Sequence, residues 1–473
     1  MKKNIYLPAI LIAFVFAACS ETLDDINSNP NATANPNPAY LLTGVEKQGA
    51  DLYWGSSADY GGALLFVQHW AAIQYGDVDR YNFTNTTGIV TTPWNTGYTT
   101  LITDLNTILE HADASVNTKG AALTLRAWVF ELLTELYGEI PYTDVGKSIV
   151  PVYNTQQEVY AALQTDLSQA LTSLNTTNGA IDGDLVYGGD VDKWRKFAAS
   201  LKLRLALRTA DRDDAGAKQI IAALNVSELI SNNSEIFQFV YTARPQNNPQ
   251  EEHFLTRNDY RLSKTIVDKL KALADPRLPV YAALPEDPTV TTYEGGANGL
   301  SNSDASSQGF DKLSRPGAYF LNATAPAVIY TYAEVLFNLA EAAQRGYISG
   351  SAETYYRQAI TASLNQFGIT NTTDIADYLA QSSVTYDAAN WKQSIGEQKW
   401  IAFFGQGLDA FAEWRRLDYP VLTAGNASLL NGKIPLRVFY PGTEQSLNGT
   451  NRAAAVARQG EDLLTTKLWF DVH

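Results

Sequence analysis

The chain has 473 residues, 45% hydrophobic and 18% charged, which is the composition of a globular protein with one large or two medium-sized domains. Its formal net charge is −15 and it contains no basic run, which argues against nucleic acid or an anionic glycan as a partner. Aromatic residues make up 11% of the chain, and their flat faces suit the apolar faces of sugars, although we expect most of them in the core.

The amino-terminal residues predict an export signal. Two lysines precede an apolar run from Ile5 to Ala18 that is too short for a comfortable membrane span. Phe16-Ala17-Ala18-Cys19 resembles a bacterial lipobox, and Cys19 is the only cysteine, so disulfides and thiolate metal sites are excluded. We therefore expect a signal peptide over 1–18 and lipidation of Cys19. The alternative is an ordinary secreted protein in which this cysteine is incidental.

Residues 19–38 are rich in Asn and Pro and lack hydrophobic periodicity, which predicts a flexible tether. Acidic residues close behind Cys19 resemble the signal that sends lipoproteins of Bacteroidota to the cell exterior. We therefore expect a lipid-anchored protein of the outer membrane that faces outward, with a single domain over 39–473.

Beyond the tether, helical periodicity dominates. Apolar residues from Leu125 to Leu136 recur at spacings of three and four, with charged residues on the other faces, and predict a helix that ends near Gly138. The stretch 194–208 repeats the pattern. A third helix is predicted from Pro326 to Gly346, and Ser351 is expected to cap a fourth.

These helices are expected in pairs: 94–137, 156–174 with 192–208, and 326–367. The pairs resemble tetratricopeptide units, although that repeat's consensus is poorly kept. The predicted fold class is all-α, with tetratricopeptide-like pairs as a scaffold, little β structure, and long loops that bind the ligand. The long polar segments are 81–92, 241–257, 285–325 and 424–458, and loops of such length are usually functional or disordered.

Chemical motifs are scarce. Four histidines occur without a metal or triad spacing, and His69 lies in an apolar run where a packing role is the default. Glu341 is expected to pair with Arg345, and Glu413 with Arg416, rather than to act as catalytic acids. We expect no catalytic residue, metal or other cofactor. A structural calcium ion at the acidic loop Asp182–Asp190 is the alternative left open.

Several ordered stretches together resemble the SusD/RagB-like family of outer-membrane nutrient-binding lipoproteins. They are Ala127-Trp128-Val129-Phe130 with Leu136-Tyr137-Gly138-Glu139-Ile140-Pro141-Tyr142, Tyr187-Gly188-Gly189-Asp190 with Trp194-Arg195-Lys196-Phe197, Tyr332-Ala333-Glu334-Val335-Leu336, and Glu397-Gln398-Lys399-Trp400 with Glu413-Trp414-Arg415-Arg416. The resemblance implies a helical core, a loop-rich ligand face, and a TonB-dependent transporter in the outer membrane (SusC-like) as the partner that receives the captured nutrient.

The family's motifs look structural, so we place Trp128, Trp194 and Trp400 in the core, and favour the same for Trp94 and Tyr98. The ligand is expected to be an oligosaccharide, or a peptide or other nutrient in the same role. The competing hypotheses are an α-helical glycosidase and a purely structural gate. The ligand-binding residues are expected among loop aromatics, amides and one arginine: Trp54, Tyr75, Tyr81, Phe83, Tyr293, Asn298, Asn302, Phe310, Arg315 and Tyr319.

Overall fold

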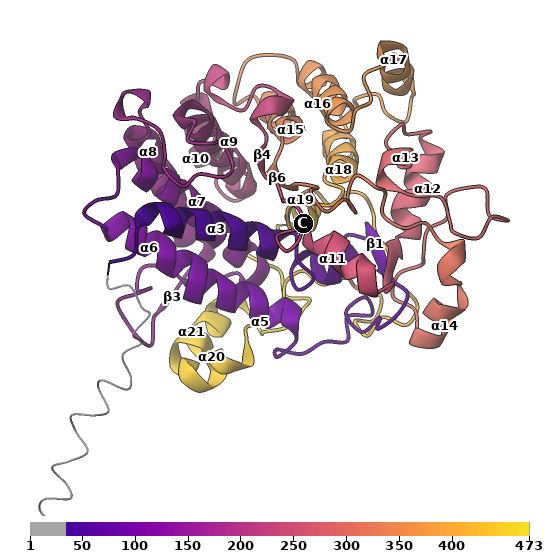
Figure 1. The fold of residues 1–473 in the computed structure, drawn as a ribbon, viewed down its shortest axis with the longest axis horizontal. Coiled ribbons are helices and arrows are strands. Elements are labelled where there is room, and N and C mark those ends of the chain that lie inside the picture. Colours follow the sequence, from indigo (N-terminus) through magenta and orange to yellow (C-terminus); the bar gives the residue numbers. More distant parts are fainter. Residues whose placement is uncertain (1–34, 473) are drawn as a thin grey trace, which may run out of the picture.

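The structure, a computed structural model, describes residues 35–472. The predicted signal peptide, Cys19 and most of the predicted tether lie outside the described residues. Helices make up most of the fold, and long loops gather on the side that carries α11, α12 and α14 (Figure 1). The mainly helical fold class is therefore confirmed.

The first half of the described chain forms α3 (Pro38–Tyr53), α4 (Leu64–Phe66), β1 (Trp70–Ala72), α5 (Gly88–Asn95), α6 (Thr103–Glu110), α7 (Val116–Tyr137), β2 (Ile140–Pro141), β3 (Tyr153–Asn154), α8 (Gln156–Ser173), α9 (Val191–Thr209), α10 (Asp214–Ala222) and β4 (Phe237–Phe239). The second half forms α11 (Pro249–Thr256), β5 (Tyr260–Leu262), α12 (Lys264–Ala272), α13 (Leu278–Tyr281), α14 (Asn302–Ser307), β6 (Ala327–Tyr330), α15 (Tyr332–Gln344), α16 (Ala352–Gln366), α17 (Thr372–Ala380), α18 (Trp391–Ala402), α19 (Gly407–Leu417), α20 (Gly442–Leu447) and α21 (Gly449–Gln459).

The helix ends follow local chemistry. The Ser115 side chain accepts from the Thr118 amide and starts α7, and Ser351 caps α16 in the same way as predicted. At the other end of α7, Gly138 has φ 87°, and a Cβ there would collide with the Gln459 side chain. Only glycine suits that backbone and that space, so α7 ends where the sequence predicted.

The predicted helix after Pro326 was wrong at its beginning. Residues 327–330 form β6, which pairs antiparallel with β4, and α15 starts only at Tyr332 after the Thr331 cap. The run Ala327-Val328-Ile329-Tyr330 is apolar and largely β-branched or aromatic, a composition that suits a fully buried strand. The long segments predicted as loops also contain short helices: α11, α14, α20 and α21.

The predicted helix pairs are confirmed. α6 packs on α7, α8 on α9, and α15 on α16, which are the three predicted pairs. In addition α7 contacts α8, and α15 and α19 both contact α18 (Figure 1). The tryptophans placed in the core by the sequence, Trp128, Trp194 and Trp400, are all at most 2% exposed, and so is His69.

Charged side chains that the sequence put on the outer helix faces lie inside. Arg204 of α9 is 1% exposed and donates to Glu334 of α15 at 2.6 Å, and it also lies 3.0 Å from Asp409 of α19. The Arg416–Glu413 pair, at 2.8 Å, belongs to the same buried cluster. These helices are buried on nearly all sides, so their polar faces meet each other rather than water.

Candidate functional site

The pairing of β1 with β5 brings two loops together at one surface. In the antiparallel register Ala72 lies opposite Tyr260, and the Ile73 amide donates to the Asp259 carbonyl at 2.8 Å. The residues just after β1 therefore face those just before β5. As a result the Arg257 guanidinium lies over the Tyr75 ring, 5.2 Å from its centroid.

Tyr75 is held in an uncommon backbone conformation. Its φ is 51°, in the left-handed region that residues with a Cβ seldom adopt, and its side chain is 71% exposed. Strain of this kind costs on the order of 1 kcal/mol or more and is found where the surrounding structure imposes it. A large ring is thus fixed at the surface instead of turned into the core.

Four hydrogen bonds hold the turn in that conformation. The Gly76 amide donates to Asn302 Oδ1 at 3.1 Å. Asp79, fully buried, accepts from the amides of Ala72 and Gly299, each at 3.1 Å, and from Asn298 Nδ2 at 2.8 Å. The turn that carries Tyr75 is therefore fastened to a loop more than 200 residues away in sequence. We name these contacts the Tyr75 clamp.

Burial also changes the ionisation of the carboxyl group in the clamp. It raises the pKa of Asp79 to about 7, even though three N–H donors favour the ionised form. Asn298 also donates to the Trp70 carbonyl at 2.7 Å and accepts from the Ser263 hydroxyl at 2.5 Å. The Asn298 side-chain amide therefore hydrogen-bonds within the protein. Asn298 supports the turn that carries Tyr75 from beneath.

A second group of side chains continues the surface. The Arg315 guanidinium lies 5.1 Å from the ring centroid of Phe254, in α11, and pairs with Glu286 at 2.9 Å. Arg261 lies 5.6 Å from the Phe310 centroid and donates to the Phe310 carbonyl at 2.8 Å. We call the whole set the Tyr75 surface: Tyr75, Phe254, Arg257, Asn302, Phe310 and Arg315.

The electrostatics favour polar, uncharged ligands. Burial, and then the neighbouring Arg315 charge, lower the pKa of Arg261 to about 10, so the group is still protonated at neutral pH. The charges of Arg257 and Arg315 are balanced by Asp259 at 2.6 Å and by Glu286. Guanidinium and amide donors beside the exposed Tyr75 ring can hold hydroxyl groups against a flat apolar face.

The structure brings together four of the ten residues predicted from the sequence: Tyr75, Asn302, Phe310 and Arg315. Trp54, Tyr81 and Phe83 are at most 8% exposed; Trp54 stacks on Phe320, and the other two pack on Phe66. Tyr319 packs its ring against Phe320 and Phe367, and Tyr293 lies partly buried against the core. Within residues 35–472, neither of these two tyrosines makes a ring contact with the Tyr75 surface.

Sequence reasoning missed Phe254 and Arg257. Both lie in the segment 241–257, which was recognised as a long polar loop but has no periodicity that marks single residues. The signal that would have found them is the β1–β5 pairing, and strands of three residues are too short to recognise from alternation.

The acidic loop considered for calcium has other partners. Asp184 accepts from three backbone amides and from the Trp194 indole at 2.8 Å, and Asp190 caps α9. Within residues 35–472, no group of three or more His, Cys, Asp or Glu side chains is arranged to hold a metal ion. In the same range, no helix is both long and apolar enough to cross a membrane.

Comparison with known proteins matches most of the chain to one protein family. Residues 30–441 match the family model SusD-like_2, described as starch-binding and associating with the outer membrane. A search of curated proteins finds no match.

Solved structures of the same fold cover almost the whole chain. A protein described as chitin-binding is 27% identical, with TM-score 0.82, over 92% of this chain and all of its own. A SusD homologue from Bacteroides uniformis is 26% identical, with TM-score 0.81 and the same coverage. A chitin-binding SusD homologue from Flavobacterium johnsoniae, 23% identical with TM-score 0.83 over 92% of this chain and 99% of its own, shows the shared fold.

Proposed function

Because the chain belongs to the SusD-like family, whose members associate with the outer membrane, we propose that it binds an oligosaccharide nutrient at the Tyr75 surface and performs no chemistry on it. The observation that carries this proposal is the exposed ring of Tyr75, held at a positive φ by the Tyr75 clamp. Two chitin-binding proteins of the same fold support a glycan as the ligand class.

The contacts suggest which residues would stack on the sugar and which would donate hydrogen bonds to it. The Tyr75 ring face away from Arg257 would stack on a pyranose ring, and Phe254 would supply a second apolar contact. Arg257, Arg315 and the Nδ2 atom of Asn302 would donate to sugar hydroxyls and fix the orientation. Because these donors are already anchored by carboxylates or by the clamp, little ordering is required when the ligand binds.

The absence of catalysis is part of the proposal. Burial lowers the pKa of His253, the histidine next to Phe254, so it is neutral at pH 7. Asp259, whose backbone carbonyl accepts from the Ile73 amide, is paired through its carboxylate with Arg257 at 2.6 Å. We further propose that the protein is anchored through lipidated Cys19 at the cell exterior and delivers its ligand to a TonB-dependent transporter.

The first test is calorimetric titration with neutral chito- and malto-oligosaccharides and with peptides, followed by analysis of the sugars for cleavage. Tyr75→Ala should weaken binding of the preferred sugar about tenfold or more, because a stacking face worth about 1–2 kcal/mol is removed. The same loss is not expected for Tyr40→Ala, since Tyr40 is 79% exposed on α3 and lies outside the Tyr75 surface.

Three results would count against the proposal. Cleaved sugar would make the protein a glycosidase. Equal losses of sugar affinity in the two variants would show that Tyr75 has no specific role in binding. Binding of peptides and of no sugar would replace the ligand class while leaving the surface in place.

A further inference from the structure

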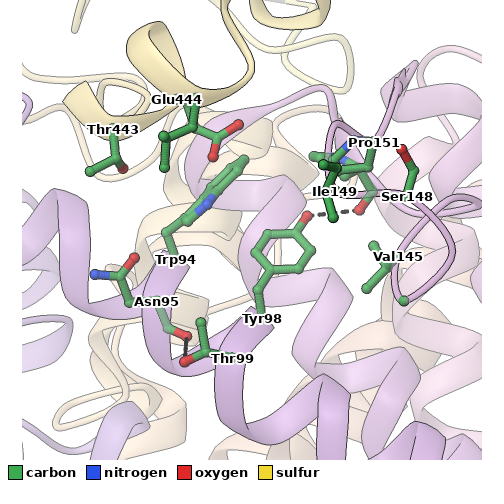
Figure 2. A pocket seen from close by; sticks show the side chains of 13 residues that line it. Trp94, Asn95, Tyr98, Thr99, Val145, Ser148, Ile149, Pro151, Thr443 and Glu444 are labelled. Carbon is green, nitrogen blue, oxygen red and sulfur yellow. Dashed lines mark hydrogen bonds between the residues drawn. The ribbon is translucent and has the colours of Figure 1, made fainter. Parts of the chain in front are cut away.

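A second site, which shares no residue with the Tyr75 surface, lines an open surface cavity of about 470 Å³. Trp94 of α5 and Tyr98 of the following π-helical segment (Thr96–Ile102) form one wall, and the loop 141–151 forms another (Figure 2). Glu444 of α20 lines the third side. We call this the Trp94 cavity.

The walls are aromatic and aliphatic. The Trp94 and Tyr98 ring centroids are 4.9 Å apart, and the Tyr98 hydroxyl donates to the Pro141 carbonyl at 2.7 Å. That bond turns the polar tip of Tyr98 toward the protein. Ile149 is 98% exposed and Leu447 is 71% exposed at the rim. Such exposed aliphatic side chains around a hollow mark a binding site for an apolar group.

Among the described residues, the only charged side chain that lines the cavity is Glu444, and its carboxylate has no cationic partner. Glu444 accepts from the Tyr153 hydroxyl at 2.6 Å, and no Lys, Arg or His side chain within residues 35–472 forms an ion pair with it. Burial, and next the Glu444 charge, raise the pKa of Tyr98 well above its usual range, as expected where a negative potential reaches into the cavity.

We propose that the Trp94 cavity binds an apolar organic ammonium ion. The apolar body would lie between Ile149 and the ring of Tyr98, and the ammonium group would pair with Glu444 near the face of Trp94. Aromatic faces and a carboxylate attract the same charge, so the two contacts reinforce each other. The chemistry fits a free amine, or the lysine side chain of a short peptide. The proposal does not depend on the Tyr75 surface.

The test compares three probes with the same aromatic body and different charge: phenethylammonium, 2-phenylethanol and 3-phenylpropionate. Titrations of the purified protein are followed by calorimetry and tryptophan fluorescence. The ammonium should bind saturably, the alcohol about tenfold more weakly, and the carboxylate not at all, because only the first pairs with Glu444. Equal binding of all three, or no binding of the ammonium, would overturn the proposal.

Two variants locate the effect. Glu444→Gln should reduce the affinity for the ammonium to that for the alcohol and leave the alcohol's affinity unchanged. Glu353→Gln, at an exposed position on α16, makes the same change in net charge and should leave all three affinities unchanged. An unaltered ammonium affinity in Glu444→Gln would refute the site. If that variant fails to fold, the probe series on the unmodified protein still decides.

A capped peptide with one lysine and its Nε-acetylated form distinguish the two sources of ammonium. If the peptide binds more tightly than phenethylammonium and acetylation abolishes its binding, the natural ligand is a peptide side chain. The reverse order would identify a small amine.

Discussion

Tyr75 and Tyr81 show that the exposure of a single side chain cannot be predicted from the sequence around it. They lie six positions apart in the loop between β1 and α5, and both have a positive φ, of 51° and 61°. Yet Tyr75 is 71% exposed and Tyr81 is 3% exposed. The difference arises because the Tyr81 ring meets Phe66 edge-on in the core, while Tyr75 is drawn to the surface by the clamp from Asn302. Neither contact is local in sequence, so both tyrosines were equally good candidates.

His69 gives a prediction for the pH dependence of stability. It is fully buried between the rings of Trp400 and Phe404. Burial lowers its pKa from 6.5 to about 3 and outweighs a smaller opposing effect of the Trp400 backbone. Between these values the unfolded chain binds a proton that the folded chain does not, so stability is present above pH 6.5 and is lost as the pH falls toward 3.

The variant His69→Phe should remove this dependence. From pH 7 to pH 5 the unmodified protein should lose about 2 kcal/mol of unfolding free energy through this group. Urea unfolding at the two pH values measures the loss in each protein, and any packing cost of phenylalanine cancels because it is the same at both. Identical losses in the two proteins would mean that His69 does not carry the effect.

At the scale of helices, the polar faces of α7, α9, α15, α18 and α19 form one buried ionic cluster. Arg204 contacts Glu131, Glu334 and Asp409, and Lys399 donates to Glu413 at 2.7 Å. Burial opposes ionisation of Glu341, but the Arg416 guanidinium outweighs it and holds the pKa of that carboxyl well below its usual range. These pairs set which helix faces which, since a shifted helix would leave a buried charge alone.

Arg204→Met should therefore destabilise the protein by about 3–5 kcal/mol, because three buried carboxylates lose their shared cation. Lys264→Met removes the exposed Lys264–Asp268 pair and should cost less than about 1 kcal/mol. Denaturant unfolding of both variants makes the comparison. A loss for Arg204→Met no larger than that of the surface variant would show that the cluster contributes little to stability.

The helices were predictable and their polar partners were not. The spacing of apolar residues located α7, α9, α15 and α16, and Ser115, Gly138 and Ser351 define helix ends through local hydrogen bonds and backbone freedom. Local pairs were predicted as well: Arg345 donates to Glu341 at 2.8 Å, four positions apart. The Arg204–Glu334 pair spans 130 positions, and periodicity carries no information about such a distance.

The same limit applies to the candidate sites. The Tyr75 surface depends on the register of two three-residue strands, and the Trp94 cavity depends on α20 meeting a helix more than 300 positions earlier. The sequence favoured a core role for Trp94 and Tyr98. Trp94 is indeed 5% exposed, but both rings also line the cavity.

On the scale of the whole molecule, the proposed anchor and the proposed binding surface can be tested separately. Cys19→Ser should move the protein from the membrane fraction to the soluble fraction and abolish labelling by radioactive palmitate, while the affinity for the preferred sugar stays unchanged. The proposed anchor at residue 19 and the Tyr75 surface have no residue in common. Fractionation, labelling and calorimetry measure the three quantities. Retention of the variant in the membrane would contradict the lipoprotein prediction.

The Tyr75 clamp also bears on how such a protein can diverge. Its hydrogen bonds to the Tyr75 turn involve backbone amides, the Asp79 carboxylate and the side chains of Asn298 and Asn302, and none of them involves the tyrosine ring. The ring can be exchanged for another side chain that tolerates a left-handed backbone while the frame beneath it is kept. With the proposed function, descendants can thus acquire new ligands by changes at the tip of one turn, and an engineer can change specificity at the same position without redesigning the scaffold.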